Sequence, residues 1–413
     1  MQMANKEKKV SIIIPTYNDL CYLKTTLNLL NLQTILPHEV IIIDSSSNND
    51  IELFIKDFNS KYIIKYKRLY QKNLFDRIFP GRARNIGLEY SECTLISFLD
   101  TKTFPSNNWL ESNLKLFNLK MPNIILGKTK YKSNLFFQQI YIKAIYGNKE
   151  LITVPGSLLN KKDLNDCLFL ENLRSGEDLE WKRRITKNFN KIEYSESPLT
   201  YSSFPSNIST LFIKFFIYSF NGALIDLQKN LKDIYFAIFI FLTVLIIPRW
   251  NYLIGNWDEN KFYIPNVTKF YLLSFLLFLI FIIFYKNFFI SRFKYLINSL
   301  YYSSLIIIFY IFFRWNGVIG NWAEETALYF PHITKIYISI VLLISFLYRG
   351  IILPIRNNCK LNELIPFKFI FIGIFGLIID LVKAPGFILG STLSIFNYSL
   401  TKSNQNKKFI IKK

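Results

Sequence analysis

One short stretch of the sequence, Leu173–Trp181, concentrates side chains that could do acid–base chemistry. Glu177 and Asp178 are adjacent carboxylates that follow Gly176. Acidic pairs are common on solvated helix faces, and that interpretation stands beside a functional one. A second carboxylate, Asp100, ends an apolar run upstream, within a region of alternating strand and helix patterns. A carboxylate that follows such a half-domain is well placed to act as a general base.

The scarcity of histidine and the spacing of the cysteines exclude several other chemistries. The chain has two histidines, His38 and His332, and four cysteines that form no CxxC pair. Ser-His-Asp, Cys-His and histidine-rich metal sites are therefore excluded, and so are a zinc site and a disulfide scaffold. Any acid–base work must be done by carboxylates.

The composition suggests a protein in contact with a membrane. The 413 residues are 51% hydrophobic and 17% aromatic, with a formal net charge of +21. The apolar residues are concentrated after about Pro205. Because cytoplasmic loops of membrane proteins are rich in Lys and Arg, the positive charge needs no nucleic acid partner, and no base-reading motif is present. Residues 1–9 resemble no secretory signal, so we expect the globular part to remain in the cytoplasm.

The globular part begins with a βαβ pattern. Val10–Pro15 and Glu39–Asp44 read as buried parallel strands, and the helix between them carries a stripe of leucines. In such sheets ligands bind at the carboxyl ends of the strands, where Tyr17 and Asp44 lie. Asp44 could accept hydrogen bonds from a base or ribose, or it could simply form an Asx turn.

Two further segments complete the predicted sheet region. Phe79–Leu88 contains glycines but is neither GxGxxG nor a P-loop. Its Arg82 and Arg84 precede a helix and could approach a diphosphate, although an arginine pair alone is a weak signal. Thr94–Asp100 reads as a third buried strand that ends in a carboxylate.

The order of these landmarks resembles the family 2 glycosyltransferases with the GT-A fold. The resemblance covers roughly residues 8–200 and is greatest for the rhamnosyltransferase-like subgroup that builds surface polysaccharides. Its landmarks are Val10–Asp19, Gln33 to Pro37, Glu39–Asp44, Gly81–Asn85, Phe98–Asp100, Pro105, Trp109–Glu111, Pro155–Ser157 and Glu171–Asp178. It implies an α/β fold with a Rossmann-like mixed sheet, a nucleotide-sugar donor, a divalent metal and inversion at the anomeric carbon.

The resemblance also implies a role for particular residues. Asp178 would deprotonate the acceptor hydroxyl, and Asp100 would be the first carboxylate of an Asp-x-Asp motif that holds Mg²⁺ or Mn²⁺. Tyr17 and Asp44 would hold the nucleoside, and Glu177 and Trp181 would shape the acceptor side. The full set of expected substrate-binding residues is Pro15, Tyr17, Asp44, Arg82, Asn85, Gly156, Ser157, Glu177 and Trp181.

One departure from the family pattern puts the metal in doubt. The second aspartate is missing, because the chain reads Asp100-Thr101-Lys102. A hard cation needs several oxygen ligands, and an ammonium group removes one and adds repulsion. Three accounts are open: metal held by Asp100 with donor phosphates and water, Lys102 neutralising the leaving diphosphate, or a degenerate domain that only binds.

The expected activity is therefore sugar transfer from a nucleotide sugar to a saccharide or lipid-linked acceptor in cell-surface polysaccharide assembly. A Gln-x-x-Arg-Trp motif of processive synthases is absent, which favours single addition. Two alternatives remain: transfer to polyprenyl phosphate, and a catalytically degenerate membrane scaffold that binds a nucleotide sugar or glycan.

The second half of the sequence predicts a helical membrane domain. We expect a glycosyltransferase domain over 1–205, an amphipathic interfacial helix over 206–232 and a membrane domain over 233–413. Four apolar runs predict about four spans and together cover Ile234–Pro248, Phe270–Tyr285, Leu300–Phe313 and Ile336–Tyr348. The charge of the loops places the first domain on the cytoplasmic side of the inner membrane, with membrane lipid as a partner.

The membrane half also contains an internal repeat. Arg249–Tyr271 matches Arg314–Tyr337, which predicts a duplicated helical hairpin whose loop tryptophans are interfacial anchors. A second, shorter repeat relates Gly222–Lys229 to Gly376–Lys383 and predicts a C-terminal surface or re-entrant helix. Asp226 and Asp380 occupy matching positions in this repeat, and ion pairs with nearby lysines are the favoured interpretation of both.

Overall fold

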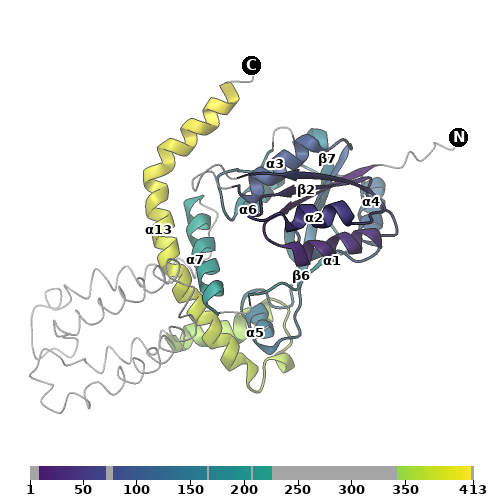
Figure 1. Ribbon diagram of the computed structural model, residues 1–413. Helices are drawn as coiled ribbons and strands as arrows, with labels where there is room; N and C mark the ends of the chain where they lie inside the picture. The colour runs from purple at the N-terminus through teal and green to yellow at the C-terminus, as the bar shows by residue number, and fades with distance from the viewer. Residues whose placement is uncertain (1–8, 71–77, 165–166, 206–207, 226–341, 411–413) are drawn as a thin grey trace, which may run out of the picture.

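The N-terminal part of the chain is built on one mixed sheet. The computed structural model describes residues 9–70, 78–164, 167–205, 208–225 and 342–410 (Figure 1). Within these residues, nine strands form a sheet in the order β3-β2-β1-β4-β7-β6-β9-β5, and β8 pairs with β6. The strands are β1 (Val10–Thr16), β2 (Glu39–Asp44), β3 (Ile63–Arg68), β4 (Leu95–Phe98), β5 (Thr103–Phe104), β6 (Ile124–Tyr131), β7 (Leu151–Asn160), β8 (Ile192–Tyr194) and β9 (Leu199–Tyr201).

The first four strands in space are parallel, which confirms the βαβ pattern read from the sequence. β1 pairs in parallel with β2 on one side and with β4 on the other. All six residues of β2 are buried, as expected for a strand covered by helices on both faces. β7 then runs antiparallel to β4. This reversal leaves the carboxyl ends of β1, β2 and β4 at one edge, where Tyr17, Asp44 and Asp100 follow.

Helices cover both faces of the sheet (Figure 1). One core cluster joins the sheet to α1 (Leu20–Asn31), α2 (Asp50–Asp57) and α4 (Trp109–Lys120). Leu23, Leu27 and Leu30 of α1 are fully buried, so the expected leucine stripe is confirmed. The opposite cluster joins the sheet to α3 (Pro80–Tyr90) and α6 (Glu177–Asn188). The two functional segments singled out in the sequence, around Arg84 and around Asp178, therefore lie on the same face.

A third, aromatic cluster connects the sheet domain to the C-terminal part. It contains side chains of α5 (Phe136–Ile145), α7 (Ile208–Leu224) and α13 (Lys368–Ile410). In Figure 1 the teal α7 lies beside the yellow α13. Close approach is possible because two glycines face α7: a Cβ on Gly386 would lie 2.6 Å from the carbonyl oxygen of Phe216, and one on Gly390 would lie 2.3 Å from that of Phe220.

The C-terminal helix α13 is one continuous element of 43 residues that follows α12 (Leu353–Arg356). Its part Lys368–Ser394 is long and apolar enough to cross a membrane, with a hydropathy of 2.0, and 50% of its most apolar window is buried. By length and composition it is the only such helix among the described residues. The expected surface or re-entrant helix at 367–383 is the first part of α13 and stays a prediction.

Most of the predicted membrane domain lies outside the described residues. This applies to the first three apolar runs, to residues 336–341 of the fourth, to the repeated tryptophan loops and to the end of the expected interfacial helix. The described part of that interfacial helix is α7, which packs against both the sheet domain and α13.

Asp380 has an arginine as a partner. Its side chain is 1% exposed and accepts a hydrogen bond of 2.6 Å from Nε of Arg349, which precedes α12 in a π-helical turn, Tyr348–Ile352. Arg349 also donates to the carbonyl oxygen of Ala144 at the end of α5. Arg349 is thus one partner of the buried Asp380, and the expected pairing of Asp380 with a nearby lysine stays a prediction.

Candidate active site

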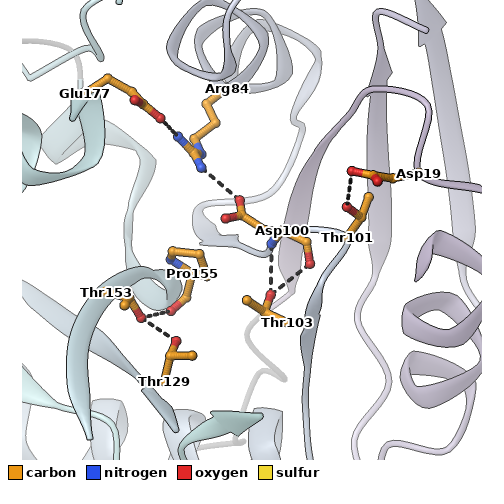
Figure 2. Close-up of polar contacts among 9 residues, drawn as sticks. All are labelled: Asp19, Arg84, Asp100, Thr101, Thr103, Thr129, Thr153, Pro155 and Glu177. Carbon is orange, nitrogen blue, oxygen red and sulfur yellow. Dashed lines mark hydrogen bonds and ion pairs between the residues drawn. The ribbon is translucent and has the colours of Figure 1, made fainter. Parts of the chain in front are cut away.

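A buried arginine joins the two carboxylate segments. Arg84, on α3, is 3% exposed and lies between Asp100 after β4 and Glu177 at the start of α6 (Figure 2). Its Nη2 is 2.8 Å from Oδ1 of Asp100, and its Nη1 is 2.9 Å from Oε1 of Glu177. A planar guanidinium suits such two-sided bonding. Arg84 is thus held by protein carboxylates, which differs from the expectation that it approaches a diphosphate.

The two carboxylates of α6 occupy different environments. Burial raises the pKa of Glu177 to about 7, the charge of Arg84 opposes this rise and that of Asp178 adds to it. Burial also raises the pKa of Asp178, while Arg84 opposes the rise. Asp178 is half-buried and is not among the residues that Arg84 contacts. A carboxylate with a raised pKa that keeps contact with solvent has the properties of a general base.

Trp181 lies in the protein core, away from any surface that an acceptor could contact. Its side chain is fully buried, its Nε1 donates to the carbonyl oxygen of Cys167 at 2.7 Å, and its ring stacks on Phe169 at 4.8 Å. The buried Trp181 side chain is therefore not placed to contact an acceptor directly. Its role is indirect, because it anchors the first turn of α6. The reason for its burial is the helical period, which places Trp181 one turn after the buried Glu177, on the face of α6 that is turned towards the protein interior.

Asn85 is likewise a structural anchor in this arrangement. It is 5% exposed, and its amide group exchanges hydrogen bonds of 2.9 Å with the backbone of Phe169. Its Nδ2 also donates to Oε1 of Glu171 at 3.0 Å. These bonds connect α3 to the segment that leads into Gly176. Arg82, one turn earlier, is half-buried.

The expected nucleoside end of the site is built from two connected loops. The backbone N–H of Asn18 donates to Oγ of Ser46 at 2.8 Å, which joins the ends of β1 and β2. Tyr17 lies there with 55% of its surface exposed, next to the half-buried Pro15. Tyr17 is therefore available to a ligand.

Asp44 has the Asx-turn geometry that the sequence left open. It is fully buried, with Oδ1 accepting from the N–H of Ser46 at 2.8 Å and Oδ2 accepting from the hydroxyl of Tyr66 at 2.7 Å. Both carboxylate oxygens have protein partners, so Asp44 shapes the loop that carries Ser45 and Ser46.

Gly156 and Ser157 form a tight bend inside β7. Ser157 is fully buried, and its Oγ accepts from the N–H of Gly127 at 3.1 Å. A neighbouring pair, Thr129 and Thr153, lies in the region below Asp100 in Figure 2 with its hydroxyl groups 2.7 Å apart. Gly156 has φ of +86°, a conformation that side chains rarely adopt.

We expect Gly156→Ala to destabilise the folded protein by about 1–2 kcal/mol, because a Cβ is strained in the left-handed region. The added Cβ would also lie 3.1 Å from Cδ1 of Leu199, so the neighbouring strand has to give way. Thermal unfolding of the full-length variant measures the effect. An unchanged melting temperature would contradict the structural role assigned to this bend.

The residues around Asp100 do not fit a divalent cation held by the protein alone. The Asp100 carboxyl is 39% exposed, and one of its oxygens is bonded to Arg84. Lys102, in the place of the second aspartate, has its Nζ 2.7 Å from Oδ1 of Asp19. Among the described residues there is no group of three His, Cys, Asp or Glu side chains that could hold a metal. One free carboxylate oxygen between two cations is a poor donor set for a hard divalent ion.

The comparisons with known proteins agree with the fold. Residues 11–169 match the model of the family described as Glycosyl transferase family 2. The N-terminal part of this chain is a family 2 glycosyltransferase domain. It has the mixed sheet of the GT-A fold, as the resemblance predicted.

Curated relatives of the glycosyltransferase domain include large enzymes. The chain is 26% identical over 195 residues to a chondroitin synthase of Escherichia coli, covering 47% of this chain and 27% of that protein. It is 24% identical over 195 residues to a poly(ribitol-phosphate) beta-N-acetylglucosaminyltransferase of Staphylococcus aureus, covering 45% of this chain and 33% of that protein. The chain thus spans about a quarter to a third of the length of these relatives.

A further relative and a solved structure complete the comparison. An uncharacterized glycosyltransferase of Rickettsia bellii is 31% identical over 187 residues, covering 42% of this chain and 26% of that protein. A crystal structure of S. aureus TarS residues 1–349 in complex with UDP-GlcNAc aligns with a TM-score of 0.39 and 20% identity, covering 52% of this chain and 67% of that one.

Sequence reasoning missed two features near the candidate site. One is the ion pair between Lys102 and Asp19, which no local pattern indicates because the residues are 83 positions apart. The other is a pair from α7, Lys214 and Tyr218, which belongs to a segment read only as membrane-facing. A lysine in the middle of an otherwise apolar helix was the available signal.

Proposed function

We propose that this chain is a membrane-bound inverting glycosyltransferase. It moves a sugar from a nucleotide-sugar donor to a saccharide or lipid-linked acceptor in cell-surface polysaccharide assembly. The proposal is supported by the family 2 domain and by relatives whose names refer to polysaccharide synthesis and N-acetylglucosamine transfer.

The observation that carries the proposal is the bridge from Asp100 through Arg84 to Glu177. It brings the carboxyl end of β4 and the first turn of α6 together, although 78 residues separate Asp100 from Asp178. The bridge supports the proposal because it holds the first turn of α6, which carries Asp178, close to Asp100, where the family pattern expects the donor diphosphate. The single positive charge of Arg84 pairs with Asp100 and Glu177, which supports Asp178 as the proposed reactive carboxylate.

In the proposed reaction Asp178 acts as the general base. Its carboxylate accepts the proton of an acceptor hydroxyl as that oxygen attacks C1 of the donor sugar. A bond forms between the acceptor oxygen and C1, and the bond from C1 to the diphosphate oxygen breaks on the opposite face. The electron pair of that bond leaves with the nucleoside diphosphate. General-base assistance of this kind contributes about a hundred- to ten-thousand-fold in rate.

The proposed binding roles divide the site residues into two groups. Pro15 and Tyr17 line the nucleoside end, and Arg82 lies on the helix that faces the diphosphate. Asp44, Asn85, Glu177 and Trp181 act indirectly, by fixing the loops and the helix that present the reactive groups. Gly156 and Ser157 shape the bend beside the sugar. Metal chemistry, which the family implies, would require oxygen ligands from the donor in addition to Asp100.

Membrane attachment is proposed from the C-terminal helix. The N-terminal turns of α13 leave a row of apolar side chains exposed, with Phe367 68%, Phe371 51% and Ile374 48% accessible. Lys368 lies in the same turns, as at many lipid interfaces. We therefore keep the organisation expected from sequence, with a domain over 1–205 in the cytoplasm, an interfacial segment over 206–232 and a membrane domain over 233–413.

A donor screen tests the proposed function. We expect one of the UDP-, GDP-, dTDP- or CDP-sugars to raise the melting temperature of the full-length protein in detergent, because a ligand that binds only the folded state stabilises it. Each donor is tested with Mn²⁺ and with EDTA. Because Asp100 has cationic neighbours, we expect the rise in melting temperature to persist in EDTA. A rise in melting temperature that requires Mn²⁺ would instead assign a metal to Asp100 and the donor phosphates. No shift with any donor would support the scaffold alternative.

A further inference from the structure

The path of the chain carries α7 past the glycosyltransferase cleft. β9 pairs antiparallel with β5, so that Tyr201 lies opposite Thr103. The chain that leaves β9 therefore runs beside Lys102, and α7 begins seven residues after Tyr201. This helix lies outside the residues that match the family model, so whatever it contributes is specific to the longer chain.

One face of α7 is turned towards the site. Lys214, Tyr218 and Asn221 are spaced at i, i+4 and i+7 and so share one stripe of the helix. Asn221 anchors that stripe, because its Nδ2 donates to Oγ of Ser175 at 3.0 Å, in the loop that leads to Asp178. Burial and neighbouring tyrosines raise the pKa of Tyr218, and the charges of Asp178 and Glu177 add to the rise. The adjacent residues Phe215 and Ser219 contact Lys383 of α13.

Lys214 lies about 10 Å along the helix from that anchor, two turns earlier. Its Nζ lies 5.4 Å from the centroid of the Tyr218 ring. No carboxylate within 4.0 Å of its Nζ is found among the described residues. Burial, and then the charge of Lys102, lowers the pKa of Lys214 to about 8. Lys214 is therefore a cation at neutral pH, near a second cation and without an acidic partner of its own.

Lys102 is oriented by contacts that leave it at the same cleft. Asp19 holds its ammonium group at 2.7 Å, and the ring of Tyr22 lies 5.1 Å away. Asp19 also accepts a hydrogen bond from Thr101, as Figure 2 shows. Lys214 and Lys102 are both half-buried and repel each other, and only Lys102 has a carboxylate partner among the described residues, so an anion that joined them would be favourable.

We propose that Lys214 of α7, together with Lys102, binds a diphosphate group beside Asp100. This proposal rests on the proposed function and deepens it. Lys214 neutralises the diphosphate from the membrane side of the cleft, where the family pattern would place a metal. The same chemistry could come from the nucleoside diphosphate of the donor or from a lipid-linked acceptor. In either case α7 completes the site, so that sugar transfer is coupled to the position of the C-terminal helices.

The test compares diphosphate binding to the full-length wild-type protein and to Lys214→Met in detergent without phospholipid. UDP, the other nucleoside diphosphates and farnesyl diphosphate serve as probes in titration calorimetry. We expect Lys214→Met to weaken binding about ten-fold or more, as for loss of a charge-assisted contact. Lys214→Arg should retain most of it. Lys187→Met, which removes an exposed lysine of α6, is the matched control and should bind like the wild type.

Two further readouts separate binding from a merely structural role. Without ligand, the melting temperature of Lys214→Met should be no lower than that of the wild type. The reason is that burial and the charge of Lys102 both disfavour the charged form of Lys214 in the folded protein. Affinity of the wild type should fall as pH rises through about 8, since Lys214 then loses its proton, and the Arg variant should not show this fall. The charged and titratable groups that face Lys214 in this comparison are Lys102 with its partner Asp19, and Tyr218.

The outcomes distinguish the two proposals. Weaker nucleotide binding by Lys214→Met assigns the site to the donor, and weaker binding of farnesyl diphosphate alone assigns it to a lipid-linked acceptor. Equal binding by wild type and Lys214→Met overturns the role of Lys214 and leaves the proposed function intact. If the wild type binds none of the probes, the proposed function fails as well.

Discussion

Asp178→Asn should reduce sugar transfer by about a hundred- to ten-thousand-fold, because the amide has the same shape as the carboxylate but cannot accept the acceptor proton. Donor binding should be nearly unchanged, since Asp178 is not expected to contact the nucleotide. The reduction should therefore appear in kcat. The measurement is transfer of radiolabelled sugar to membranes, with the donor that the thermal-shift screen identifies.

Glu180→Gln provides the matched control for Asp178→Asn. It removes one carboxylate from the same helix, where Glu180 forms a half-buried i,i+4 ion pair with Arg184. Activity should remain within about two-fold of the wild type, because Glu180 has no role in the proposed proton transfer. Full activity of Asp178→Asn would show that another group is the base. Loss of activity in both variants would point to a general effect of charge on α6.

Arg84→Met should be the most destabilising single change in the site, with a loss of about 3–5 kcal/mol in the free energy of unfolding. Removing one partner of a buried ion pair leaves charges without compensation. Most of this loss of free energy of unfolding comes from Glu177, because its side chain is only 6% exposed. The carboxylate of Asp100 is 39% exposed and can be hydrated when Arg84 is absent. Chemical denaturation of the full-length protein measures the loss. Lys56→Met breaks an exposed pair with Glu52 and should cost less than about 1 kcal/mol.

A second substitution identifies the source of that cost. Arg84→Met combined with Glu177→Gln should recover part of the lost stability, because the unpaired carboxylate is then gone. The deficit of Arg84→Met should also depend on pH. The pKa of Glu177 is about 7 in the folded protein and ordinarily 4.5, and loss of Arg84 raises the folded value further. Below about pH 7 both folded proteins hold the extra proton on Glu177, and above it only the wild type releases that proton, so the deficit should grow as pH rises above about 7. A deficit that does not vary with pH would contradict this account.

The sequence alone determined the architecture of the first half of the chain. Continuous apolar runs such as Glu39–Asp44 predict buried strands, because only a sheet covered on both faces tolerates them. The leucine stripe of α1 and the placement of Tyr17 and Asp44 after their strands follow from the same local periodicities. The order of motifs then predicted the GT-A fold, which the family match confirms. These features are readable because each depends on neighbours within a few residues.

The roles of individual polar residues were decided only by the tertiary structure. Nothing near Arg84 in sequence shows that it binds Asp100 and Glu177, since those contacts span 16 and 93 residues. Trp181 follows the acidic pair in sequence, yet the turn of the helix buries it in the core. Lys214 reads as one charge in an apolar helix, and only the tertiary structure brings it within electrostatic range of Lys102. Local patterns specify which elements form, whereas long-range packing decides which side chains meet.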